Sequence, residues 1–393
     1  MDPVIVVTGT RGIPGILGGV ETHCEELLPR IVARGYQVVL VRRKNYVKDR
    51  LTSFKGVRLC DIPNVKIKSF EAIIHTFRAI WKARWTYKAD IVHIHSIGPA
   101  LLTPFARALG LKIVFTHHGP DYEREKWGKV AKYMLRTGER FGCIFAHQVI
   151  VISNAINATI KQKYGRDDAH FIPNGVPAPT LTDDTAYIEE LNIKPRKFIF
   201  AMGRFVPEKN FHLLIHAYLN LKPAGYRLVI AGDADMEDAY SRALKSFAKE
   251  NDIILTGFIK GNKLFALLSN AALFVLPSSH EGLPIALLEA MSYGLPVLAS
   301  DISANKEVPL PPSCYFKLTQ RRRHTVPEKL MQRGNRAVPH DANIENLTEA
   351  LSYQLKNLTR PVYDLSAYNW DRIAEQTEQA YRQCLSFIKF FPD

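Results

Sequence analysis

Short apolar segments alternate with longer segments of helical pattern along most of the chain. The first series of apolar segments covers Val4–Thr8, Gln37–Val41, Ile91–His95, Ile113–Thr116 and Gln148–Ile152. The second series covers Phe198–Met202, Arg227–Gly232, Ile253–Gly257, Leu273–Leu276 and Pro296–Ser300. Helical periodicity fills the intervals, for example at Glu21–Arg34 and Phe70–Tyr87. Strands that alternate with helices of this length form βαβ units, so the sequence predicts an α/β fold with parallel sheets.

A proline-rich segment separates the two series. Residues 173–179 read PNGVPAP and are followed by the polar run TLTDDT, a composition that is typical of a linker. We therefore predict two Rossmann-like, doubly wound domains, at residues 1–178 and 179–366. A last helical pattern, Trp370–Phe391 within residues 367–393, is expected to return to the first domain. Ligands of such sheets bind beyond the carboxyl ends of the strands, so we expect the two domains to face each other across a shared cleft.

The charge balance is strongly basic, with 52 Lys or Arg against 38 Asp or Glu and a net charge of +14. The excess is concentrated in residues 42–88, where thirteen Lys or Arg accompany three Asp or Glu. This segment lacks the pattern of an RNA-binding sheet and the spacing of a helix-turn-helix. The charge therefore favours a membrane surface or an acidic ligand over nucleic acid as a partner.

The cysteines and the apolar runs bear on the compartment. The five cysteines are odd in number and far apart, and no C-x-x-C pair occurs, which argues against a disulfide or zinc framework. The start MDPVIVV lacks a basic region, and eighteen uninterrupted apolar residues occur nowhere. We expect a cytoplasmic protein and leave open a peripheral contact with the anionic inner membrane on its cytoplasmic face.

The helical pattern at Phe70–Tyr87 allows two interpretations. Its apolar residues fall on one stripe: Phe70, Ile73, Ile74, Phe77, Ile80, Trp81 and Trp85. Basic residues lie beside the stripe: Arg78, Lys82, Arg84 and Lys88. The favoured interpretation is a helix packed on the sheet with a solvated basic face. The alternative is an interfacial helix that holds the protein against anionic lipid.

A glycine-rich turn, GTRGIPGILGGVET, follows the first predicted strand. Gly9, Gly12 and Gly15 fit a dinucleotide-binding pattern, which suggests an NADP-dependent sugar-nucleotide epimerase or reductase. Three observations oppose this. The second strand ends in two arginines instead of an acid, the Y-x-x-x-K pair at Tyr122 and Lys126 comes too early, and the second domain would have no purpose. The adjacent pair Gly18 and Gly19 could instead let backbone N–H groups reach a ligand.

The stretch LPSSHEGLPIALLEAMSYGLPVLAS, residues 276–300, reads as a strand end, a loop, a helix and another strand. Pro284 is expected at the first helical position, where proline is tolerated best. A helix that begins there offers N–H groups and a partial positive charge to phosphate. Glu281 and Glu289 would repel phosphate, so we expect these two carboxylates to bind hydroxyl groups of the ligand.

Two cations follow the first strand of the second domain, in the segment GRFVPEKN. Arg204 and Lys209 suit a diphosphate leaving group, because a planar guanidinium fork and an ammonium can stabilise its charge without Mg²⁺. Asp233 and Asp235 resemble a D-x-D metal motif, but two such acids are common in loops. We therefore predict no metal ligand and no cofactor.

Histidines are concentrated in the segments IVHIHS and THHG. His93 and His95 share one face of a predicted strand, and His117 and His118 end the next one. A metal site needs a third ligand at matching spacing, and the sequence offers none nearby. His118, which precedes Gly119, is placed to hydrogen-bond a substrate, although such histidines are often structural.

Taken together, these segments resemble the retaining glycosyltransferases of family 4. The resemblance rests on GTRGIPGILGGVET, THHG, IPNGV, GRFVPEKN, AGDA, TGF and EGLPIALLEAM, and it covers nearly the whole chain. It implies the GT-B fold, in which two Rossmann-like domains face across a cleft. The opening segment is similar to a subgroup of bacterial enzymes that make cell-surface polysaccharides.

The resemblance also implies roles for individual residues. Arg204 and Lys209 would bind the donor diphosphate together with the backbone of Gly282, Leu283, Pro284 and Ile285. Glu281 would bind hydroxyls of the donor sugar, and Glu289 those of the ribose. Gly18 and Gly19 would close on the donor, His118 would lie near the reacting sugar, and Phe258 would lie at the edge of the base. Ala304–Glu307 departs from the family, in which a glycine pair precedes an acid there, and this leaves the role of Glu307 open.

The sequence therefore predicts the transfer of a hexose or deoxyhexose, with retention, from a nucleotide sugar to a lipid-linked or glycan acceptor. The reductase and a basic protein that binds nucleic acid or a membrane surface are the alternatives. The base, the sugar and the acceptor are chosen by loop shapes that the sequence does not reveal.

Overall fold

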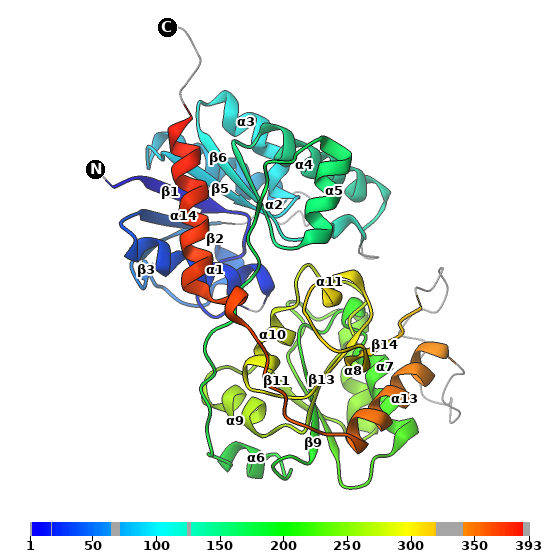
Figure 1. Cartoon of the computed structure of the whole chain (residues 1–393). Helices are drawn as coiled ribbons and strands as arrows, with labels where there is room; N and C mark the ends of the chain where they lie inside the picture. The colour runs from blue at the N-terminus through cyan, green and yellow to red at the C-terminus, as the bar shows by residue number, and fades with distance from the viewer. Residues whose placement is uncertain (1, 17, 64–70, 124–126, 320–340, 388–393) are drawn as a thin grey trace, which may run out of the picture. The chain divides into compact units, whose positions relative to one another are not determined.

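The computed structural model describes residues 2–16, 18–63, 71–123, 127–319 and 341–387. The chain divides into two compact units, which we call the first domain (Met1–Gly175 with Ser366–Asp393) and the second domain (Val176–Leu365). Each is an α/β sandwich around a largely parallel sheet (Figure 1). Phe70, Lys126 and residues 388–391, which enter the predictions above, lie outside the described residues.

The sheet of the first domain has the strand order β3-β4-β2-β1-β5-β6-β7-β8. Its strands are β1 Val4–Thr8, β2 Gln37–Arg43, β3 Ser53–Phe54, β4 Val57–Ile62, β5 Ile91–His95, β6 Lys112–His117, β7 Gln148–Val151 and β8 His170–Phe171. Pairing is parallel except between β3 and β4. The central strand β5 is buried at every position, as expected of a parallel strand with helices on both faces.

Helices cover both faces of this sheet. They are α1 Gly19–Ala33, α2 Glu71–Trp85, α3 Thr103–Ala108, α4 Lys129–Phe145, α5 Asn154–Tyr164 and α14 Trp370–Ser386. On one face, α1 and α14 lie side by side (Figure 1) and share a core with β1, β2 and β5. Trp370 and Tyr381 of α14 are fully buried there. The last helix therefore completes the first domain, although it is separated from the rest of that domain by the whole second domain.

The second domain repeats this architecture with the strand order β11-β10-β9-β12-β13-β14, all parallel. Its strands are β9 Phe198–Met202, β10 Arg227–Ala231, β11 Ile254–Gly257, β12 Leu273–Leu276, β13 Val297–Ser300 and β14 Tyr315–Phe316. Its helices are α6 Ala186–Glu190, α7 Phe211–Leu221, α8 Ala239–Glu250, α9 Asn262–Asn270, α10 Ile285–Ser292, α11 Ser303–Lys306 and α13 Ala342–Lys356.

The strand order reverses direction once in each sheet, between β1 and β5 and between β9 and β12. In doubly wound sheets the crevice beyond the carboxyl ends of these two strands binds ligands. Gly9 and Ser96 follow the two strands in the first domain, and Gly203 and Pro277 follow them in the second. The predicted doubly wound α/β fold is thus confirmed.

The stripe predicted on α2 divides between core and surface. Ile80 is fully buried, but Phe77, Trp81 and Trp85 are 42%, 50% and 53% exposed. The buried face of the helix is formed instead by His75, Thr76, Ala79, Ile80 and Ala83. The favoured interpretation, that the whole stripe packs on the sheet, is therefore wrong for the three aromatic residues. Among the described helices, none is both long and apolar enough to cross a bilayer.

Candidate functional site

In the second domain, the loops after β9 and β12 are tied together at the point where the strand order reverses. The backbone N–H of Ser279 donates to the carbonyl of Glu208 at 2.8 Å. The side-chain amide of Asn210 donates to the carbonyl of Pro277 at 3.0 Å. Because a buried amide and a backbone pair link the loops, the side chains that project from them are held close to one another.

Lys209 and Glu281 form an ion pair across these two loops. Lys209 Nζ lies 2.5 Å from Glu281 Oε1, and both side chains are largely buried, at 16% and 13% exposure. Burial alone would raise the pKa of Glu281, but the charge and hydrogen bond of Lys209 outweigh it and lower that pKa. An ammonium has three hydrogens, so the lysine can hold this carboxylate and still donate to a second oxygen ligand.

Arg204 and the predicted D-x-D acids also form ion pairs. Arg204 Nη1 lies 3.1 Å from Asp235 Oδ2, and Asp233 Oδ1 lies 2.8 Å from Lys245 Nζ. Each carboxylate of the D-x-D motif is thus paired with a cation of the protein. The guanidinium has five N–H donors and keeps the capacity to bind a further oxygen.

The helix α10 begins one residue later than predicted. Pro284 is the N-cap, with extended backbone, and Ile285 is the first helical residue. No side chain caps this end and no acid lies in its first turn, so the positive end of the helix dipole is not neutralised locally. Leu283 and Pro284 are buried, while Gly282, Ile285 and Glu289 are half-buried. Phe258, which follows β11, is 41% exposed.

In the first domain, Glu21 occupies the centre of the glycine-rich turn. Its Oε1 accepts hydrogen bonds from the hydroxyl of Thr10 at 3.1 Å and from the backbone N–H of Arg11 at 3.0 Å. Its Oε2 lies 2.9 Å from Arg11 Nη2. Gly18, at φ 155°, has no room for a side chain, because a Cβ there would lie 2.1 Å from this carboxylate. The Glu21 carboxylate thus accepts the hydrogen bonds of the glycine-rich turn that, in a dinucleotide-binding protein, would be donated to a phosphate.

Arg42 does not provide a site for the 2′-phosphate of NADP. Its side chain is fully buried at the end of β2, where it forms ion pairs with Asp49 at 3.0 Å and with Asp61 at 2.7 Å. A guanidinium held by two carboxylates is neutralised within the fold. The geometry of β2 therefore gives the NADP alternative no support.

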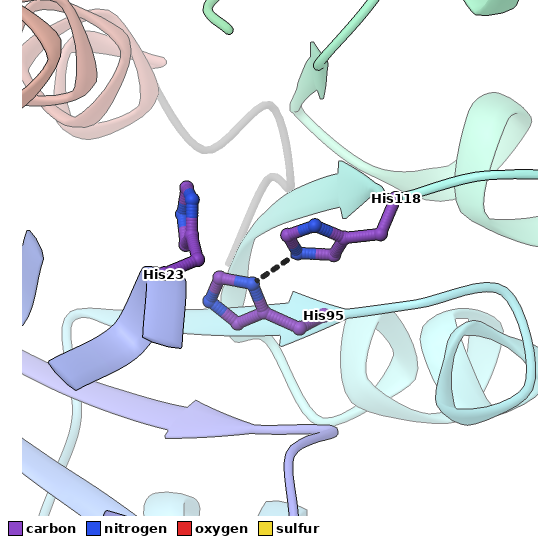
Figure 2. Close-up of side chains that lie close together, drawn as sticks. All are labelled: His23, His95 and His118. Atoms are coloured by element: carbon purple, nitrogen blue, oxygen red, sulfur yellow. Dashed lines mark hydrogen bonds between the residues drawn. The ribbon is translucent and has the colours of Figure 1, made fainter. Parts of the chain in front are cut away.

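Three histidines meet beyond the carboxyl ends of β5 and β6, as Figure 2 shows. His23 comes from α1, His95 ends β5 and His118 directly follows β6, and their ligand-capable nitrogens all lie within 4.8 Å of one another. Burial lowers the pKa of His23 to about 4 and also lowers the pKa values of His95 and His118. All three rings are therefore neutral near pH 7.

The hydrogen-bond partners define how these rings carry their hydrogens. His95 Nδ1 lies 2.9 Å from His118 Nε2, and the buried His95 Nε2 has no partner among the described residues. A buried N–H without an acceptor is costly, so we place the hydrogen of His95 on Nδ1, where it is donated to His118. His118 then keeps its own hydrogen on Nδ1. Asn174 fixes His23 through a contact of 3.0 Å between Oδ1 and Nδ1.

The three rings also form a group that could hold a metal ion. Three imidazoles are a common set of zinc ligands, and the structure supplies the third histidine that the sequence did not indicate. However, the facing nitrogens of His95 and His118 share one hydrogen. The two nitrogens cannot both bind a metal while that hydrogen bond stands.

A buried carboxylate supports the loop that carries His118. Glu139 of α4 is fully buried and accepts a hydrogen bond from His117 Nε2 at 2.9 Å, while His117 Nδ1 accepts from the backbone N–H of Gly119 at 3.1 Å. Burial would raise the pKa of Glu139, but hydrogen bonds from His117 and Tyr164 lower it. Glu139 thus fixes the backbone on both sides of His118.

Family models match both halves of the chain. Glycosyltransferase Family 4 matches residues 17–178, and Glycosyl transferases group 1 matches residues 183–309. An Escherichia coli protein, UDP-Gal:alpha-D-GlcNAc-diphosphoundecaprenol alpha-1,3-galactosyltransferase, is 31% identical over 66% of this chain and 69% of its own length. The chain belongs to glycosyltransferase family 4.

Solved structures show the same fold for this glycosyltransferase. Sucrose-phosphate synthase from Thermosynechococcus elongatus has a TM-score of 0.78 at 19% identity, covering 98% of this chain and 99% of that one. HepE from Anabaena, in complex with UDP-glucose, has a TM-score of 0.70 at 17% identity, covering 98% and 100%. The predicted family and the GT-B fold are confirmed, and the enzyme is a glycosyltransferase.

The structure brings together only some of the predicted site residues of this glycosyltransferase. Lys209 pairs with Glu281, and Arg204 lies in the same loop after β9 as Lys209. Gly18, Gly19 and His118 belong to the first domain. The roles of all these residues toward a donor stay predictions.

Sequence reasoning missed several residues on which the polar clusters depend: Glu21, His23, Glu139, Asn174 and Asn210. Asn210 directly follows Lys209, whereas Glu139 lies within a helical segment away from every predicted site residue. Nothing in a single sequence indicates that these side chains point inward.

Proposed function

We propose that this glycosyltransferase transfers a hexose or deoxyhexose from a nucleotide-sugar donor, with retention, to a lipid-linked or glycan acceptor. The observation that carries the proposal is the ion pair of Lys209 and Glu281 beside the uncapped N-terminus of α10. A diphosphate, which is anionic, suits the ammonium and the helix end, and a sugar hydroxyl suits the carboxylate. The name of the E. coli relative supports a hexose donor and a lipid-linked acceptor.

In this proposal Lys209 keeps one hydrogen on Glu281 and turns the others to the diphosphate. Arg204 adds a second cation after the same strand. The backbone N–H groups of Gly282, Leu283 and Ile285 donate from the start of α10, whereas Pro284 has no N–H to donate. As the bond from the anomeric carbon to the diphosphate oxygen breaks, these groups stabilise the charge that develops on that oxygen. The positive charge comes from the protein, so we propose that the donor needs no metal ion for this step.

The acceptor oxygen forms its bond to the anomeric carbon on the face from which the diphosphate departs. Its proton passes to the departing diphosphate oxygen, which balances the reaction without a protein nucleophile. Glu281 binds the donor sugar and Glu289 the ribose, while the exposed ring of Phe258 is available to the edge of the base. His118 serves the reacting sugar as a donor from Nδ1.

We place this reaction in the cytoplasm, in the synthesis of bacterial surface polysaccharide. The described cysteines, Cys24, Cys60, Cys143, Cys314 and Cys384, are all unpaired, which fits a reducing compartment. We propose no nucleic-acid partner for this enzyme.

A thermal-shift screen of the whole protein with UDP-, GDP-, ADP- and dTDP-sugars, in the presence of EDTA, tests the proposal. We expect one nucleotide sugar to raise the melting temperature and the matching nucleoside diphosphate to compete with it. Glu281→Ala and Lys209→Ala should both weaken this response. If both variants keep full transfer activity with the donor that is found, the site assignment is wrong.

A further inference from the structure

The outer face of α2 combines exposed aromatic rings with positive charge. Phe77, Trp81 and Trp85 recur at intervals of four residues, and their ring centroids are 6.4 Å and 5.8 Å apart in sequence order. Arg78 and Arg84 are exposed beside them, and the Arg84 guanidinium lies 5.0 Å from the Trp85 ring centroid. Large exposed aromatic patches on soluble proteins usually mark a binding surface.

The outer face of α4 has the same composition. Val130 is 75% exposed and Tyr133 is 72% exposed, and Lys129, Arg136 and Arg140 are exposed on the same helix. The one acid of α4, Glu139, is fully buried in its contact with His117. The exposed positions of α4 therefore carry cations and apolar groups but no carboxylate.

The two helices lie on the same side of the first-domain sheet. Both contact the 3-10 helix Pro99–Leu102, and α3 contacts α4. The ring of Phe77 on α2 stacks on the ring of Phe105 on α3, at 5.0 Å between centroids. Surfaces of neighbouring helices that point away from one sheet point the same way, so the outer faces of α2 and α4 form one composite surface. We call it the α2–α4 face.

Acidic groups are almost absent from the elements that form this face. The only acid of α2, Glu71, is half-buried and lies 3.8 Å from the guanidinium of Arg43. Cations and tryptophans without intervening carboxylates fit a surface that is anionic over a wide area and apolar just beneath it. This is the chemistry of a bilayer that contains anionic lipid, where tryptophan lies at the headgroup level and basic side chains meet the phosphates.

We propose that the α2–α4 face docks the enzyme on an anionic lipid bilayer. The aromatic residues of α2 enter the headgroup region, and the cations of both helices bind lipid phosphates. Docking of this kind concerns where the enzyme lies and does not depend on which sugar is transferred. It would bring the first domain to a lipid-linked acceptor, so it also fits the proposed function.

Vesicle flotation of the full-length protein tests the proposal. We expect binding to phosphatidylcholine vesicles that contain phosphatidylglycerol, weak binding to phosphatidylcholine alone, and release at high salt. Replacing both α2 tryptophans (Trp81→Ala with Trp85→Ala) should weaken binding by about tenfold or more. The matched control is Tyr353→Ala, which removes a ring that is 55% exposed on α13 of the second domain, and it should bind as wild type does.

A second measurement separates lipid from other partners. Brominated anionic lipid should quench the fluorescence of the wild type but hardly that of the double tryptophan variant, whose fold is checked by circular dichroism. Equal binding to neutral and anionic vesicles, or unchanged binding of the double variant, overturns the proposal. It is also overturned if light scattering shows that the wild type dimerises through this face and the variant does not.

Discussion

The sheet edge after β5 and β6 in the first domain and the edge after β9 and β12 in the second hold their polar side chains by different means. The first is a cluster of neutral histidines, in which His95 and His118 share a hydrogen. The second is built from ion pairs, Lys209 with Glu281 and Arg204 with Asp235. Both occupy positions where doubly wound sheets bind ligands.

The difference concerns what each edge can exchange with a ligand. A neutral, buried hydrogen-bond network is costly to open, because each group that loses its partner pays its own desolvation. In the second-domain pair, the Lys209 ammonium has hydrogens to spare, so it can take a second anionic partner without giving up Glu281. The second-domain edge therefore suits the charged part of a ligand, and the first-domain edge offers a fixed, uncharged surface.

The largest effect is expected from Lys209→Ala. Loss of the ammonium removes charge stabilisation from the leaving group and leaves Glu281 without its cation, so transfer should fall by up to about 1,000-fold. Initial rates with the donor found in the thermal-shift screen measure this. Lys249→Ala, which removes an exposed lysine of α8, is the control. A Lys209→Ala variant with the wild-type rate would show that the second-domain edge does not use this charge to stabilise the leaving group.

The neutral histidine cluster of the first domain predicts that the free energy of unfolding depends on pH. The pKa of His23 is about 4 in the fold and about 6.5 when unfolded. As pH falls from about 6.5 to 4, His23 becomes protonated in the unfolded chain but stays neutral in the folded one. The free energy of unfolding therefore falls, by about 3 kcal/mol in total. Above pH 6.5 the contribution is fully present.

Denaturant unfolding across this pH range tests that prediction against His23→Gln. The variant should lose less stability than wild type as the solution is acidified, whatever its stability at neutral pH. Lys249→Ala should follow the wild-type curve. Parallel curves for His23→Gln and wild type would mean that His23 is not held neutral by the fold.

Glu139→Gln should act on catalysis through the backbone of the THHG loop. The amide keeps one acceptor for His117 but loses the charge that holds His117, Tyr122 and Tyr164 together. We expect kcat to fall by about tenfold, as for other outer supporting residues, with little change in the donor KM. Glu375→Gln, on the exposed side of α14, is the control. A rise in donor KM at constant kcat would show that Glu139 serves donor binding instead.

The smallest effect is expected from metal removal. EDTA should leave the initial rate unchanged, because Lys209, Arg204 and the start of α10 supply the positive charge for the diphosphate. An activity that EDTA abolishes and zinc restores would overturn this, and His23, His95 and His118 would then be the first candidate ligands to substitute.

The two edges also differ in how far the sequence reveals them. Arg204, Lys209 and Glu281 were predicted, because their residue types and their place after apolar strands indicate an anion site. His23 and Glu139 were not, because they come from helices whose register against the sheet depends on packing that one sequence does not report. β4 was missed as well: Arg58 and Asp61 interrupt its apolar pattern, and its pairing with β2 compensates.

The same limit explains the stripe on α2. Helical periodicity showed correctly that Phe77, Trp81 and Trp85 share a face with Ile80, but it could not say which side of that face meets the sheet. Small residues, Ala79 and Ala83, pack inward with Ile80, because they allow the helix to approach the sheet closely. The bulky rings are displaced to the outside.

The position of α14 has a consequence for the order in which this protein can be made. The apolar surface of α1 that covers β1 and β2 is shared with residues near the end of the chain, Trp370 and Tyr381 among them. A nascent chain must therefore leave the ribosome through the whole of Val176–Leu365 before the first core can close, an interval on the order of tens of seconds. During that interval the apolar surface of α1 that α14 will cover stays open to solvent, the kind of transient exposure that makes a partly folded chain prone to aggregate. A chain that stops before residue 370 would carry a complete second domain and an unfinished first one.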